Sequence, residues 1–216
     1  GHGPEQAAAA SSLRSAWSAM AMLPQLDIDD WAAGMQHVLA ENDPERTMFV
    51  TVVMGTLDPG TRALRYTTAG HPPPLLLCGD EIVRGEESGP PLGVMPEAKL
   101  VEFELDAREC HGVLLVTDGI FEGFESPASR RRIGWDDFVE LVRTGEDCIA
   151  PHYLERLADG MVQRNGGPLQ DDVAALLMLW GEVEPEAQPP SRRAPRPACR
   201  RPAHAAVHRQ GRRLGA

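Results

Sequence analysis

The sequence lacks the features that mark membrane and secreted proteins. No apolar stretch approaches the roughly 18 consecutive residues of a membrane-spanning helix, and no signal-peptide pattern opens the chain. We therefore expect a cytoplasmic protein with no membrane partner. An initial methionine is also lacking, since the chain begins Gly1-His2-Gly3. This start favours a fragment or a processed product.

Cysteine is scarce, and its spacing excludes the common zinc motifs. The chain contains no CxxC pair, and its one adjacent Cys-His pair, Cys110-His111, has no zinc-ligand partner nearby. We expect reduced cytosolic thiols at all four cysteines, which are Cys78, Cys110, Cys148 and Cys199.

Positive charge is in deficit over most of the chain. Lys and Arg number 21 against 32 Asp and Glu, for a net charge of -11. Residues 181–216 reverse this balance with a net of +5, which leaves -16 for the residues before them. An acidic body repels nucleic acid, so we expect no nucleic-acid partner.

The same composition predicts one folded region and a tail. A hydrophobic content of 42% suits a single domain with a full core over residues 1–181. Residues 182–216 are a basic mixture of Pro, Ala and Arg without periodicity, which predicts a disordered tail.

The pattern along the folded region predicts helices, then strands, then helices and a final strand. Pro4 followed by alanines indicates an N-terminal helix, and Asp27 or Asp29 can cap the next one, which Asn42-Asp43-Pro44 ends. The expected helices are 7–22, 29–40, 135–142 and 151–164, and the expected strands are 47–57, 62–68, 75–78, 81–84, 100–105, 113–117 and 173–180.

Two of these strands carry carboxylates at one end. The strand over 113–117 has no polar alternation, which predicts burial on both faces, and it stops on Asp118-Gly119. Asp171-Asp172 precedes the last strand. Oxygen ligands on rigid strand ends suit a hard dication such as Mg²⁺ or Mn²⁺. The alternative is structural, because Asp-Gly is a common turn and either acid of the pair can cap a strand.

Five segments in this order and spacing resemble the PPM-type metal-dependent serine/threonine protein phosphatases, in their bacterial SpoIIE-like branch. They cover residues 1 to about 180 and are Gly1-His2-Gly3 with the helix after it, 68–74 (TAGHPPP), 89–93 (GPPLG), 115–119 (LVTDG) with Glu122, and 170–173 (QDDV).

The resemblance implies an α+β fold, an αββα four-layer sandwich with a two-metal site at one edge. It implies that two Mn²⁺ or Mg²⁺ ions activate a water for hydrolysis of phosphoserine or phosphothreonine on a protein substrate. Asp118 and Asp171 match ligand positions, and Asp172 is the adjoining candidate. The implied substrate is a phosphorylated anti-anti-sigma regulator of the STAS type.

The resemblance also implies that the family's first motif is incomplete here. Its metal-bridging aspartate would precede Gly1, and so would the first strands of the fold. Two alternatives to an active phosphatase follow: a catalytically silent phosphatase-like binding module, and a truncated product that does not fold stably.

Other residues have both a functional and a structural interpretation. His2 and His71 could protonate a leaving group or could support turns. Glu122 could be an outer acid of the metal site or a surface residue. Residues 72–74 (PPP) could bind a polyproline-recognising partner or form an extended turn, and residues 130–132 (RRR) could hold a phosphate or be solvated.

Overall fold

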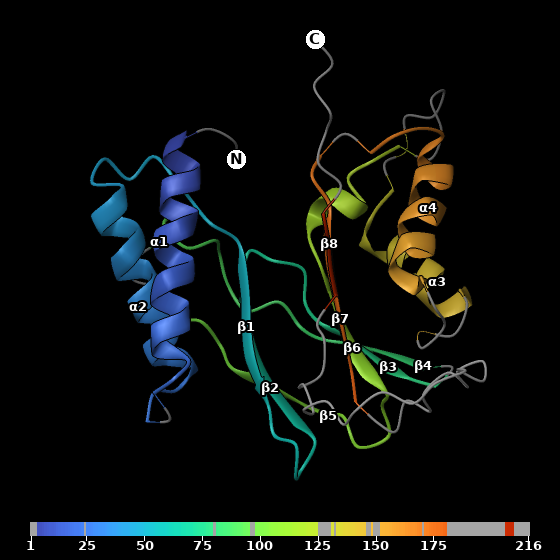
Figure 1. Cartoon of the computed structure of the whole chain (residues 1–216), viewed down its shortest axis with the longest axis horizontal. Helices are drawn as coiled ribbons and strands as arrows, with labels where there is room; N and C mark the ends of the chain where they lie inside the picture. Colours follow the sequence, from blue (N-terminus) through green and yellow to red (C-terminus); the bar gives the residue numbers. More distant parts are fainter. Residues whose placement is uncertain are drawn as a thin grey trace, which may run out of the picture. The chain divides into compact units, whose positions relative to one another are not determined.

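The computed structural model describes residues 4–23, 25–79, 81–95, 98–124, 131, 133–145, 148, 152–169, 171–180 and 206–209. The chain divides into two units. The first contains Gly1–Leu75 and Val83–Glu109, and the second contains Leu76–Ile82 and Cys110–Ala216. Each unit combines helices with strands (Figure 1).

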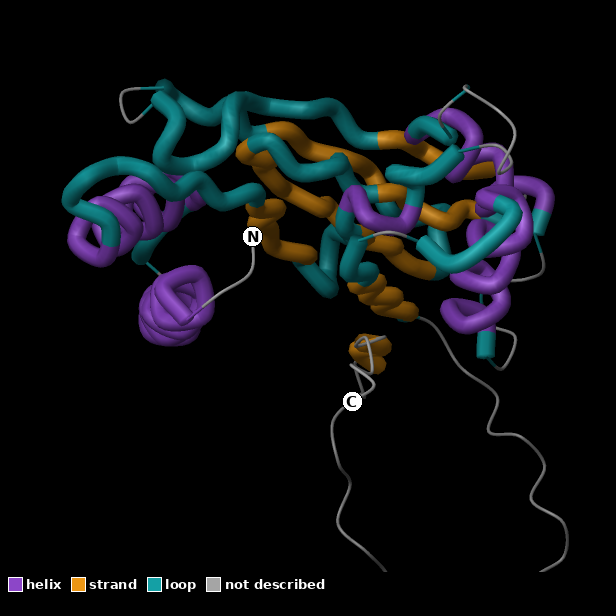
Figure 2. Tube along the Cα trace, turned by 90° about the horizontal axis from the view of Figure 1, so that it is seen from above, coloured by secondary structure: helices purple, strands orange, loops and turns teal. Residues whose placement is uncertain are grey.

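Two helices open the first unit and lie side by side (Figure 2). Helix α1 spans Pro4–Met20, and helix α2 spans Ile28–Asn42. Asp27 caps α2 as its sequence predicts: the Asp27 carboxylate accepts from the Asp30 amide at 2.9 Å, and the Asp30 carboxylate accepts from the Asp27 amide. Asp43 follows the last helical residue, so the predicted stop is also confirmed.

The sheet of the first unit has three strands in the order β1-β2-β5. Strand β1 is Val52–Leu57, β2 is Ala63–Ala69 and β5 is Phe103–Asp106, and both pairings are antiparallel. The helices bury their apolar faces against it in one cluster, which includes Leu13, Trp31, Met35, Leu39, Met54 and Ala69.

The sheet of the second unit has five strands in the order β4-β3-β6-β7-β8. They are β3 (Leu75–Cys78), β4 (Glu81–Arg84), β6 (Gly112–Val116), β7 (Ala174–Leu179) and β8 (Ala206–Arg209). Strand β6 is almost completely buried and lies in the middle of the order, as its unbroken apolar run predicts.

Two helices belong to this second unit. They are α3 (Trp135–Thr144) and α4 (Tyr153–Asn165), and they pack on each other. Phe138 of α3 is fully buried and stacks with Trp135 and with Phe121, which follows β6. This aromatic cluster fixes α3 against the segment that leaves β6.

The fold class is confirmed as α+β with two antiparallel sheets, and two strands are shorter than predicted. The strand expected over 47–57 begins only at Val52. The strand expected over 100–105 begins only at Phe103, and Val101 is 52% exposed. Its backbone instead bonds the side chains of Ser88 and Thr67. Within residues 182–216, Ala206–Arg209 forms β8, which pairs with β7.

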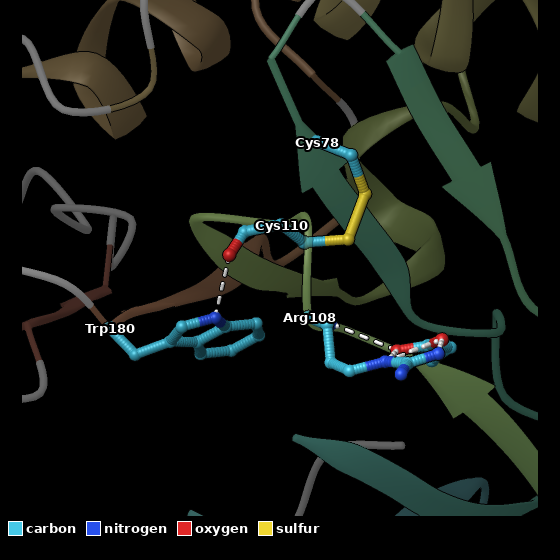
Figure 3. Close-up of a disulfide and its surroundings, with 5 residues drawn as sticks. Cys78, Arg108, Cys110 and Trp180 are labelled. Atoms are coloured by element: carbon cyan, nitrogen blue, oxygen red, sulfur yellow. Dashed lines mark hydrogen bonds and ion pairs between the residues drawn. A yellow bond between two sulfur atoms is a disulfide. The ribbon is translucent and has the colours of Figure 1, made fainter. Parts of the chain in front are cut away.

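The prediction of four reduced thiols is wrong for two of them. Cys78 and Cys110 form a disulfide (Figure 3), and the Trp180 indole donates to the Cys110 carbonyl at 2.7 Å beside it. The two cysteines are 32 residues apart in sequence. They meet because β3 and β6 are neighbours in the sheet, which no local spacing rule reveals.

Among the described residues, no helix is both long and apolar enough to cross a bilayer.

Candidate metal centre

The predicted ligands lie at one edge of the second sheet. Strands β6 and β7 are antiparallel, and Val116 pairs with Ala175. The end of β6 and the start of β7 are therefore at the same edge. Asp118 lies just past the end of β6, and Asp171-Asp172 lies just before the start of β7. The topology thus brings together acids that are more than fifty residues apart in the sequence.

A close backbone contact joins the segment that follows β6 to the segment that precedes β7. After β6 the chain turns into a short 3₁₀ helix, η1 (Asp118–Ile120), in which Gly119 is buried. A Cβ atom added to Gly119 would overlap the carbonyl oxygen of Asp172 and would lie 3.4 Å from the Asp171 Cβ. Glycine is thus required for the turn that carries Asp118 to approach the Asp171-Asp172 backbone.

The three carboxylates are exposed at this edge. Asp118 Oδ1 accepts from the Gly119 amide at 3.0 Å, and Asp171 Oδ1 accepts from the Asp172 amide at 2.8 Å. These local bonds restrict the two side chains and leave other carboxylate lone pairs for a cation. No Lys or Arg among the described residues forms an ion pair with any of the three acids.

Their donor chemistry fits a hard dication, although they form only part of a ligand set. Carboxylate oxygens are preferred by Mg²⁺ and Mn²⁺, which commonly keep several water ligands when few protein ligands are supplied. In the part of the chain that the structure describes, no group of three or more His, Cys, Asp or Glu side chains is placed to hold a metal ion. Asp118 and Asp171, with Asp172 beside them, would thus hold a dication together with ligands from elsewhere.

Glu122 lies close in sequence and in structure to Asp118. Its amide donates to the Asp118 carbonyl at 3.1 Å, and its side chain is exposed. Glu122 therefore lies just after η1 and close to Asp118. Its role as an outer acid of the metal site stays a prediction.

The two histidines of the prediction differ in whether the structure describes them. His71 is half-buried directly after Gly70, in the first unit, and its role stays a prediction. His2 lies outside the described residues, as do the other residues of the Gly1-His2-Gly3 motif and Gln170.

The structure gives two of the prolines a structural role and describes only one of the three arginines. Pro73 and Pro74 are less than 2% exposed, and the Pro74 carbonyl accepts from the Gly85 amide at 2.9 Å, so these two cannot serve as an exposed ligand motif. Arg131 pairs with Asp137 of α3 at 2.8 Å. Arg130 and Arg132 lie outside the described residues.

Sequence reasoning missed one residue of the site, Gly119. It entered only as the second half of an Asp-Gly turn, whereas the structure shows that its lack of a side chain lets the two acidic segments meet. The available signal was the glycine directly after a strand-end aspartate, which is ambiguous because the same dipeptide ends many strands.

Comparison with known proteins identifies relatives over most of the chain. Residues 1–180 match the family model described as Stage II sporulation protein E (SpoIIE). A structure of the RsbU and RsbW domains of Rv1364c from Mycobacterium tuberculosis is 27% identical, with a TM-score of 0.61 over 82% of this chain. This chain spans 49% of the length of that protein's chain.

Two further structures share the fold at lower identity. The SiaA-PP2C domain of Pseudomonas aeruginosa is 17% identical with a TM-score of 0.70, over 84% of this chain and 72% of that one. The phosphatase domain of SpoIIE from Bacillus subtilis is 14% identical with a TM-score of 0.51, over 82% of this chain and 76% of that one.

Proposed function

The chain belongs to the SpoIIE family of PPM-type protein serine/threonine phosphatases, and we propose that it hydrolyses phosphoserine or phosphothreonine on a protein with the help of two bound Mn²⁺ or Mg²⁺ ions. The observation that carries this proposal is the approach of Asp118 to Asp171 across Gly119 at the ends of β6 and β7. Two antiparallel neighbouring strands there bring carboxylates to the same end of the sheet, and a multi-metal phosphatase needs carboxylates around one site.

In this proposal the chain's own residues supply placement and charge. The dications, when bound, supply a water nucleophile of lowered pKa and the positive charge that stabilises a phosphoryl group in transfer. Asp118 and Asp171 would hold them, with Asp172 as a further ligand. Glu122, one turn after Asp118, would accept hydrogen bonds from ordered waters around the ions and so orient them.

Hydrolysis of p-nitrophenyl phosphate tests the reaction. We expect product release by the purified chain with Mn²⁺ and none with a chelator. Asp118→Asn should lower the rate about 100-fold, because a neutral amide replaces a ligand charge. Asp159→Asn is the matched control, since it makes the same change on the exposed surface of α4. Equal rates for Asp118→Asn and the control would contradict the site.

For the substrate, we propose a phosphorylated STAS-type anti-anti-sigma regulator, which would place the reaction in the cytoplasm. The support is the family and the 27% identity to a structure that contains an RsbU domain. Phosphate release from a folded, phosphorylated STAS protein should exceed release from a phosphoserine peptide of the same local sequence. Equal efficiency on both would contradict a substrate recognised by its fold.

A catalytically silent phosphatase-like module is the second candidate. The observation that favours it is that the described part of the chain groups fewer than three possible metal ligands. It predicts a folded chain that binds a phosphoprotein without Mn²⁺-dependent release of phosphate. Mn²⁺-dependent release of phosphate by the purified chain would exclude the silent module.

A further inference from the structure

The last hydrogen bonds between β6 and β7 depart from a regular ladder. One position beyond the Val116–Ala175 pair, the Thr117 amide donates to the Ala174 carbonyl at 2.9 Å. In a regular antiparallel pair the Ala174 amide would donate to the Thr117 carbonyl in return. Here it donates at 2.9 Å to the Thr117 side-chain hydroxyl, Oγ1. The side chain thus takes the place of a backbone acceptor.

The carbonyl that this exchange releases is used by the turn that carries Asp118. The Thr117 carbonyl accepts from the Ile120 amide at 3.2 Å, which is the first bond of η1. Leaving a partly buried amide without a partner is unfavourable, so without the hydroxyl the Ala174 amide would compete with Ile120 for the carbonyl. Thr117 satisfies both amides, and the chain leaves β6 directly into η1.

The same hydroxyl also faces the other acidic segment. Oγ1 lies 3.5 Å from the Asp172 carbonyl oxygen and 3.4 Å from the Ala174 carbonyl oxygen. The hydroxyl thus has two possible acceptors, both in the backbone that follows Asp171. Gly119, the second residue of η1, lies against the same Asp172 carbonyl. Both backbone segments that carry acids are thus tied together at one threonine side chain.

We propose that Thr117 is a positioning residue of the metal centre, whose hydroxyl sets the separation between Asp118 and Asp171 without contacting a metal ion or the substrate. This inference rests on the proposed function, because it assigns a purpose to the geometry of that site. It explains why a residue with both a hydroxyl and a β-branch stands here: the branch suits the strand end, and the hydroxyl replaces the backbone acceptor.

Mn²⁺ binding by the 216-residue chain, followed by electron paramagnetic resonance of the unbound ion, tests the proposal. Thr117→Val keeps the shape and removes the hydroxyl, so the dissociation constant should rise about tenfold, in the range for residues that orient metal ligands. Thr117→Ser restores the hydroxyl and should return it to within about threefold. Thr56→Val, at an exposed position of β1, is the matched control and should leave binding unchanged.

Two comparisons separate failure of this inference from failure of the proposed function. If Asp118→Asn also binds Mn²⁺ as the unmodified chain does, or if the unmodified chain binds none, the metal site itself is refuted. If Asp118→Asn weakens binding and folded Thr117→Val does not, only the role of Thr117 is overturned.

A second pair of variants covers the case in which Thr117→Val does not fold. Thr117→Ser and Thr117→Cys have similar size, but a thiol is a poor hydrogen-bond partner. Folded Thr117→Cys should bind Mn²⁺ about tenfold more weakly than Thr117→Ser. Equal binding by these two variants would overturn the proposal.

Discussion

Gly119 has no space for a side chain at the candidate site. Its backbone lies against the Asp172 carbonyl, where even a methyl group has no space, and backbone atoms cannot give way as a flexible side chain can. The position of Asp118 therefore depends on a neighbour that carries no functional group.

Gly119→Ala should separate the two acidic segments. We expect a loss of about 1–3 kcal/mol in unfolding free energy and a loss of Mn²⁺-dependent phosphatase activity of about tenfold or more. Urea denaturation and phosphate release measure the two effects. Gly167→Ala is the matched control, because nothing lies within 4 Å of the added Cβ there. Activity of Gly119→Ala equal to that of the control would contradict the close contact.

At the scale of elements, the N-terminus of α3 depends on an ionised side chain. The Asp137 carboxylate accepts from the Gly134 amide at 3.0 Å and pairs with Arg131 at 2.8 Å. The pKa of Asp137 lies below its ordinary value of 3.8 for two reasons. The larger cause is the hydrogen bond from the Gly134 amide, and the second is the hydrogen bond from Arg131.

This lowered pKa predicts a pH-dependent stability of the second unit. The stabilisation by Asp137 is fully present above about pH 4 and is lost as the pH falls through the lowered folded-state pKa, because protonation removes the acceptor charge. The difference in unfolding free energy between the unmodified chain and Asp137→Asn should thus shrink between pH 6 and pH 3. Arg131→Ala should keep part of that dependence, since the Gly134 amide remains. Parallel pH curves for the unmodified chain and Asp137→Asn would exclude this cap.

The Cys78–Cys110 disulfide stabilises the junction between β3 and the start of β6. For cysteines 32 residues apart, the loop-entropy model gives about 3–4 kcal/mol of stabilisation. Reductant should therefore lower the midpoint of thermal unfolding, and a Cys78→Ser, Cys110→Ser double variant should melt like the reduced chain. The double variant itself should not respond to reductant. An unmodified chain whose midpoint is unchanged by reductant would show that the bond is absent or makes no contribution.

The elements themselves were largely predictable from the sequence, whereas their pairing was not. The cap at Asp27, the stop after Asn42 and the buried run of β6 depend on nearby residues, so local rules found them. The Cys78–Cys110 bond and the pairing of Ala206–Arg209 with β7 depend on which strands become neighbours. Periodicity carries no information about which strands become neighbours.

On the scale of the whole molecule, the net charge before the basic tail is compatible with the proposed metal site. Residues before 181 carry a net charge of -16, and the candidate site adds three exposed carboxylates at the end of two paired strands. Such a surface attracts dications and repels other anions. A phosphorylated substrate would thus need bound metal to approach, which couples substrate affinity to metal occupancy.

The candidate site could be predicted only in part, because local patterns mark single residues but not the contacts between paired segments. Asp118 and Asp171 were found because strand ends and a family pattern marked both, and the structure brings their backbones together. That the turn after β6 depends on the Thr117 hydroxyl and on Gly119 could not be predicted, since it is a property of two paired backbones and not of either segment alone.

Anomalous X-ray diffraction at the manganese edge, from crystals grown with Mn²⁺, tests the central claim most directly. The account predicts an anomalous peak within coordination distance, about 2.0–2.3 Å, of carboxylate oxygens of both Asp118 and Asp171. Crystals of Asp118→Asn should show a weaker peak or none. A manganese peak bound elsewhere, with Asp118 and Asp171 both unligated in the unmodified chain, would contradict it.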